Sequence, residues 1–137
     1  MDRSRQQHLW INRKHHRVDT ELGCELCLPE GGLVPARIID LSVGGLKFSC
    51  DRQALFSILP EDQRTPGQVS DVELEMRFEF QPLHQPVTSI RVRVLIIHSE
   101  RLAQDKYHVG VEFIDMDSAT ARALVNYIEE WWERQQS

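Results

Sequence analysis

Three polar residues at a fixed spacing could form a binding surface. Asp40 and Ser42 lie two positions apart, and Gly45 follows them. Because side chains two apart on a strand project from the same face, a strand would present the carboxylate and the hydroxyl together. Gly44 and Gly45 would let the backbone turn tightly and let a ligand approach without meeting a Cβ atom. Acceptor oxygens beside bare backbone suit a ligand rich in N–H donors, such as a guanine.

A second pattern lies upstream, where Arg13 and Arg17 are four positions apart. Taken alone, this pair is better explained as a solvated basic turn, since the chain is rich in arginine. The downstream Asp-x-Ser-x-x-Gly spacing would arise by chance only roughly 0.03 times in a chain of this composition. Together and in this order, the two patterns resemble the signatures of the PilZ domain family. The resemblance runs from about Arg13 to the C-terminus, and residues 107–113 are similar to the final strand of that family.

The resemblance implies a bacterial receptor for cyclic di-GMP. By the roles of the matched positions, Arg13 and Arg17 would contact phosphate and guanine, Asp40 and Ser42 would bind a guanine edge, and Gly45 would allow close approach. Arginine can meet the O6/N7 edge of guanine with two parallel N–H bonds and can also stack on the base. Lys14, His16 and Asp19 are given only auxiliary roles, phosphate contact or stacking among them.

This interpretation predicts how the receptor would signal. Binding would order a basic N-terminal arm over the ligand, so that recognition and folding of the arm occur together. The arm carries a short apolar patch, Leu9-Trp10-Ile11, whose placement would create or hide a surface for an effector protein of the motility, chemotaxis or exopolysaccharide machinery. One dinucleotide or a stacked pair would fit this scheme.

Composition predicts one domain. With 137 residues, 41% of them hydrophobic, the chain suits residues 1–12 as an arm and residues 13–137 as a single PilZ-like domain. The net charge is −5, yet residues 1–17 carry +4, which leaves −9 for the rest. An acidic body argues against general nucleic-acid binding, and the short arm has no repeated aromatic platform. A small phosphorylated ligand fits better.

Other features of the sequence predict a cytoplasmic protein. No apolar run approaches the length needed to span a membrane, and no signal-peptide core is visible. Three cysteines, an odd number, suit a reducing compartment.

Alternating apolar residues predict six short strands, at residues 21–28, 33–42, 45–50, 72–80, 87–99 and 107–113. Apolar residues at helical spacing after an N-cap at Asp117 predict a final amphipathic helix. The expected fold is therefore mainly β: a small six-stranded antiparallel β-barrel packed by a C-terminal α-helix, as the PilZ resemblance also implies.

The connections are less regular. Residues 51–59 are expected to form a helical turn or two whose apolar side chains cover one end of the core, and residues 101–106 a polar loop. The core-covering side chains would be Leu55, Phe56, Ile58 and Leu59. Leu95 and Ile97 would continue an apolar strip on the outside of their strand, to be covered by the last helix or by a partner.

Two other functions compete with the receptor hypothesis. One is a PilZ-like adaptor that acts only through protein contacts and needs no nucleotide. The other is a metal or redox protein that uses the Cys24-x-x-Cys27 pair, but residues three apart on a strand face opposite sides, so we expect a buried Cys24, a half-exposed Cys27 and no metal site. No nucleophile motif, P-loop or carboxylate pair is present, so we expect no enzyme.

Overall fold

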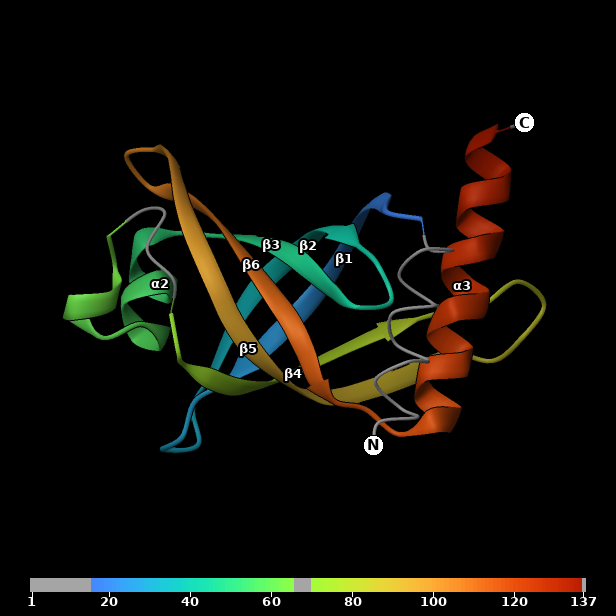
Figure 1. Cartoon of the computed structure of the whole chain (residues 1–137), viewed down its shortest axis with the longest axis horizontal. Coiled ribbons are helices and arrows are strands. Elements are labelled where there is room, and N and C mark those ends of the chain that lie inside the picture. Colours follow the sequence, from blue (N-terminus) through green and yellow to red (C-terminus); the bar gives the residue numbers. More distant parts are fainter. Residues whose placement is uncertain (1–15, 66–69, 137) are drawn as a thin grey trace.

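The computed structural model describes residues 16–65 and 70–136. Its six strands close into an antiparallel barrel in the order β1-β2-β3-β6-β5-β4 (Figure 1). The strands are β1 (Val18–Cys27), β2 (Leu33–Leu41), β3 (Gly45–Cys50), β4 (Glu73–Phe80), β5 (Thr88–Ala103) and β6 (Lys106–Asp115). The barrel with its C-terminal helix confirms the fold predicted from the alternating pattern.

Helices cover the two ends of the barrel. Helix α2 (Arg52–Ile58), followed by the 3-10 turn η1 (Glu61–Gln63), lies at one end, and helix α3 (Ser118–Gln136) lies at the other (Figure 1). Asp51 caps α2 by accepting the Ala54 N–H at 2.8 Å, and Asp117 accepts the Thr120 N–H at 2.7 Å at the start of α3. Both caps satisfy amide donors that the first helical turn leaves unpaired.

The core fills the barrel and continues under α3. Strands β4 and β5 each bury alternate residues, as predicted. Helix α3 buries Leu124, Tyr127 and Ile128, and the Tyr127 ring packs 4.8 Å from the ring of Phe80. The helix therefore closes the barrel end at which β4 finishes.

Two local expectations were wrong. Phe56 does not cover the core: it is 40% exposed, with the Arg52 and Arg64 guanidinium groups 5.1 and 4.1 Å from its ring. Residues 101–106 are not one loop, because β5 runs to Ala103 and β6 begins at Lys106, which leaves a two-residue turn. Phe56 lies on the side of α2 opposite to its buried residues, and the length of the β5–β6 hairpin is set by cross-strand pairing.

A bulge in β5 changes which residues face outward. The pairing of β5 with β6 shifts register between Ile96 and His98. Ile96 and Ser99 are buried, so the two residues between them, Ile97 and His98, both lie on the outer side. The bulge thereby places the side chains of both Ile97 and His98 on the outer side of the barrel, next to β6.

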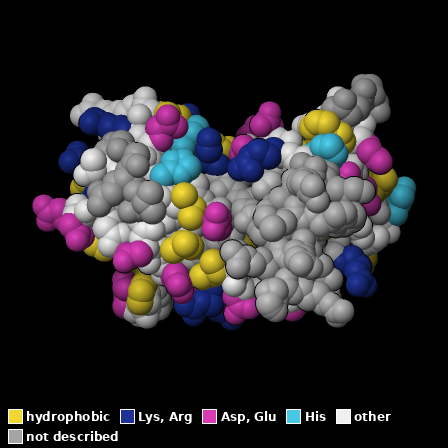
Figure 2. Space-filling model, viewed as in Figure 1, with side chains coloured by type: hydrophobic (Ala, Val, Ile, Leu, Met, Phe, Trp, Pro, Cys, Tyr) yellow, Lys and Arg dark blue, Asp and Glu magenta, His cyan; other side chains and the backbone are white. Residues whose placement is uncertain are grey.

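The outer surface is charged with both signs. Arg77 pairs with Glu25 at 2.7 Å and Arg93 with Glu73 at 2.7 Å, each across neighbouring strands. In the view of Figure 2, basic and acidic side chains are interspersed over the barrel and form no large patch of one sign. Within the described ranges, no helix has the length and apolar character needed to cross a membrane.

Candidate functional site

The described arginine of the upstream motif lies on the strand-turn motif. Arg17 precedes the first residue of β1, and its Nε donates to Asp40 Oδ2 at 3.4 Å. Its NH1 donates to Ser42 Oγ at 3.3 Å. Residues from two separate motifs thus meet at the end of β2, where Asp40 and Ser42 present their oxygens to one guanidinium group.

Ser42 is fixed by the turn that follows it. It is 7% exposed, its N–H donates to Gly45 O at 2.9 Å, and its Oγ donates to the same carbonyl at 3.1 Å. The Ser42 hydroxyl thus donates to the Gly45 carbonyl and accepts from Arg17, so it acts both as a donor and as an acceptor. The turn holds the Ser42 oxygen at one place beside the Asp40 carboxylate.

The Asp40 carboxylate retains an unused acceptor. Its side chain is 21% exposed, and Oδ1 is buried, 3.3 Å from Arg17 Nε. That contact brings opposite charges together, yet no hydrogen bond from the described part of the chain is directed at Oδ1. A buried acceptor without a donor is costly, so this oxygen is a ready partner for an N–H group brought by a ligand.

Gly45 has a packing role that the sequence did not indicate. A Cβ built at this position would lie 2.1 Å from Val111 O, the carbonyl of the neighbouring strand β6. Gly45 pairs with Glu112, and the Phe113 N–H donates to Gly44 O at 3.0 Å. The glycine therefore lets β3 and β6 approach closely at the start of β3.

A pocket of about 520 Å³ opens beside these groups. It extends from Arg17 across the outer side of β3 and β6 to the bulge in β5. Its lining consists of Arg17, Ser42, residues 44–47, Ile97, His98 and residues 110–113. Of the motif residues, Arg17, Ser42 and Gly45 line the pocket, and the rest of its wall is built by residues outside both motifs.

Lys47 and His98 also line the pocket, and neither was singled out from the sequence. Lys47 is the cross-strand partner of Asp40 on one side and of Gly110 on the other. The His98 ring lies over Gly110, where an added Cβ would be 2.8 Å from the imidazole Cε1. Lys47 could have been found by extending the strand alternation past the turn, whereas His98 depends on the bulge.

Of the five site residues expected from the sequence, the structure brings Arg17, Asp40 and Ser42 into direct contact and places Gly45 in the same turn. Arg13 lies outside the described residues, as does the Leu9-Trp10-Ile11 patch.

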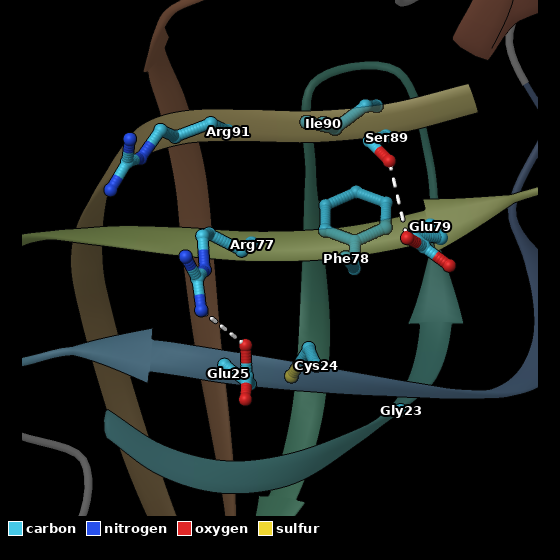
Figure 3. A pocket seen from close by; sticks show the side chains of 9 residues that line it. All are labelled: Gly23, Cys24, Glu25, Arg77, Phe78, Glu79, Ser89, Ile90 and Arg91. Carbon is cyan, nitrogen blue, oxygen red and sulfur yellow. Dashed lines mark hydrogen bonds and ion pairs between the residues drawn. The ribbon is translucent and has the colours of Figure 1, made fainter.

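A second depression, of about 720 Å³, lies on the outer side of β1, β4 and β5 (Figure 3). Its polar groups already pair with one another or with neighbours: Arg77 with Glu25, Ser89 with Glu79 at 3.2 Å, and Arg91 with Glu75. Its apolar floor, Cys24, Phe78 and Ile90, belongs to the core. The groups that could hold a ligand are thus engaged with the protein itself.

The cysteines confirm the burial expected of them. Cys24 is buried, Cys27 is half-buried, and all three thiols are free. Burial raises the pKa of Cys24 and of Cys50 to about 12, which keeps both as neutral thiols. Among the described residues, no group of three or more potential metal ligands gathers.

Comparison with known proteins identifies the family. The model of the PilZ domain matches residues 11–130. The chain belongs to the PilZ domain family. No curated protein matches it.

Solved structures share the PilZ fold at low sequence identity. The inhibitor of motility MotI (DgrA) of Bacillus subtilis aligns with a TM-score of 0.66 at 14% identity, over 90% of this chain and 52% of that one. The PilZ domain of YcgR from Escherichia coli, solved with c-di-GMP, gives 0.59 at 13% identity, over 90% and 94%. The MrkH–c-di-GMP complex of K. pneumonia gives 0.67 at 11% identity, over 90% and 54%. The chain thus spans about half the length of MotI and MrkH and nearly all of the YcgR domain.

Proposed function

We propose that this PilZ domain is a receptor for cyclic di-GMP and acts by binding, with no catalytic step. The observation that carries the proposal is the guanidinium of Arg17 lying on Asp40 and Ser42 at the mouth of a pocket. Membership of the PilZ family and the c-di-GMP complexes of the structural neighbours YcgR and MrkH support the ligand class. The ligand-binding residues would be Arg13, Arg17, Asp40, Ser42 and Gly45.

The chemistry of the Arg17 contact suggests how guanine would bind. A guanidinium group directs N–H donors from nitrogens that share one carbon, and the N1–H and N2 amino edge of guanine has the same arrangement. Arg17 therefore occupies acceptors, Asp40 and Ser42, that suit a guanine edge. When the base takes these acceptors, including the unpaired Asp40 Oδ1, the side chain of Arg17 is released to meet a phosphate or the O6/N7 edge of a base.

Signalling would follow from the position of Arg17 at the junction of arm and barrel. We propose that ligand binding fixes residues 1–12 against the barrel and changes the surface offered to an effector protein. The three free thiols are in keeping with a protein that acts in the cytoplasm. The role of residues 1–12 stays a prediction, because these residues lie outside the described part of the chain.

Titration calorimetry tests the proposal. We expect the native chain to bind cyclic di-GMP, and Arg13→Ala and Arg17→Ala each to weaken binding by roughly 10- to 100-fold, the loss expected for hydrogen bonds to charged groups. Binding should also weaken as salt is raised. Arg122→Ala, which removes an exposed guanidinium on α3, serves as the control and should bind as the native chain does.

Two outcomes would contradict the proposal. Unchanged affinity in both Arg13→Ala and Arg17→Ala would show that neither arginine contacts the ligand. A native chain that shows no binding at all would favour the adaptor that works through protein contacts alone.

A further inference from the structure

The C-terminal helix α3 contacts the segment of the chain that carries Arg17. The ring of His16 stacks on the ring of Trp132, with centroids 3.9 Å apart and planes inclined by 7°. His16 Nε2 lies 3.8 Å from Glu129 Oε1, one helical turn earlier in α3. An aromatic stack beside a carboxylate holds the imidazole from its face and from its edge.

The neighbouring tryptophan of α3 holds the chain on the other side of Arg17. Trp131 Nε1 donates to the backbone carbonyl of Asp19 at 2.8 Å. The Arg134 guanidinium lies 4.7 Å from the Trp131 ring and covers it. Between these two contacts, Val18 is fully buried and pairs with Leu41 of β2. The backbone is thus attached to the body of the domain at 16, 18 and 19.

Arg17 is the one residue of this short segment whose side chain reaches the pocket. Its side chain is 58% exposed, and it keeps its place at Asp40 by contacts of 3.3 to 3.4 Å. Exposed contacts of this length are weak by themselves, since solvent screens the charges and a long side chain loses entropy when it is held. The direction of Arg17 therefore depends on how firmly its backbone neighbours are held.

We propose that Trp132 is a positioning residue of the ligand site: its stack on His16 fixes the backbone from which Arg17 reaches Asp40 and Ser42. This inference rests on the proposed function. Loss of the stack frees His16 and Arg17, and ligand binding must then supply the free energy needed to order them. The affinity of the site for cyclic di-GMP thereby depends on a helix residue that lies outside both motifs.

The test is a double-mutant cycle measured by calorimetry with cyclic di-GMP. We expect Trp132→Ala and His16→Ala each to weaken binding roughly tenfold, and the double variant to lose no more than either single one, because both remove the same stack. His16→Phe and Trp132→Phe retain two flat rings and should bind within about twofold of the native chain. Asn126→Ala, an exposed position of α3, is the matched control.

Thermal unfolding of each variant separates positioning from loss of the fold. The barrel core includes neither His16 nor Asn126, so His16→Ala should unfold near the native temperature and still bind more weakly. Affinity unchanged in His16→Ala and Trp132→Ala, or losses that add in the double variant, would overturn the inference while leaving the receptor proposal intact. A native chain that does not bind the dinucleotide would overturn both.

Discussion

Arg17 and Asp40 are joined by a hydrogen bond from Nε to Oδ2 of 3.4 Å across 23 positions of sequence. The pair connects the segment before β1 with the end of β2, and it covers the acceptor surface that we assign to guanine. Under the proposed function, Arg17 occupies acceptors that guanine would take, and binding would be an exchange of one set of N–H donors for another.

Replacement of the carboxylate tests this exchange. In Asp40→Asn, one acceptor oxygen becomes an NH₂ donor that opposes the N–H groups of guanine, and the charge is lost. We expect cyclic di-GMP to bind roughly 10- to 100-fold more weakly, measured by calorimetry. Asp71→Asn alters an exposed carboxylate that makes no contact with Arg17 in the described part of the chain, and this variant should bind normally. Equal affinity of Asp40→Asn and the native chain would exclude a guanine contact at this carboxylate.

Lys47 gives a prediction about a cationic side chain in the wall of the pocket. It lines the pocket beside Asp40, and within the described ranges it forms no ion pair, so its ammonium group is available to a phosphate. Lys47→Gln should weaken binding several-fold and make the affinity less sensitive to salt, because one charge contact is lost. Lys106→Gln, at the β5–β6 hairpin, should leave both the affinity and its salt dependence unchanged. A salt dependence that is the same in Lys47→Gln and the native chain would show that Lys47 does not meet the phosphates.

Replacement of Gly45 should lower the stability of the fold itself, whatever its effect on ligand binding. In Gly45→Ala the new methyl group would lie 2.1 Å from Val111 O, so β3 and β6 must move apart. We expect the free energy of unfolding to fall by about 1–3 kcal/mol, measured by denaturant titration. Gly23→Ala is the matched control, since a Cβ there meets nothing within 4 Å. Equal stability of the two variants would contradict the close approach of β3 and β6.

The cysteines should differ in reactivity. The thiolate is the reactive form, and burial raises the pKa of Cys24 and Cys50 to about 12, so at pH 8 both remain protonated. A thiol reagent should therefore modify the half-buried Cys27 rapidly and the other two only after denaturation. Rapid titration of all three thiols in the folded chain would show that the barrel opens there.

Much of the fold could be predicted because strands that face a core alternate in hydrophobicity. The inward residues of β4 and β5 follow that rule up to Ile96, and the predicted cap Asp117 accepts the Thr120 N–H at the start of α3. The bulge after Ile96 escaped prediction, since a register shift is set by the partner strand. Because of this register shift, His98 lines the pocket, which the alternating pattern did not predict.

The candidate site was predictable only in its motif residues. Spacing placed Asp40 and Ser42 on one face, and the family resemblance named Arg17. The stack of His16 on Trp132 joins the two ends of the described chain, and such a contact leaves no mark in local periodicity. The packing role of Gly45 likewise depends on a carbonyl of β6, far away in sequence.

The bond from Trp131 to Asp19 has a further consequence for the shape of the barrel wall. Within the described residues, β1 pairs with β4 only from Cys24 to Cys27, so the first half of β1 has no strand beside it on that side, and the indole of Trp131 is bonded to the Asp19 carbonyl of this half. A chain cut short before Trp131 would leave a bare strand edge. Because such edges recruit strands from other molecules, we expect the shortened chain to self-associate more readily than the native one.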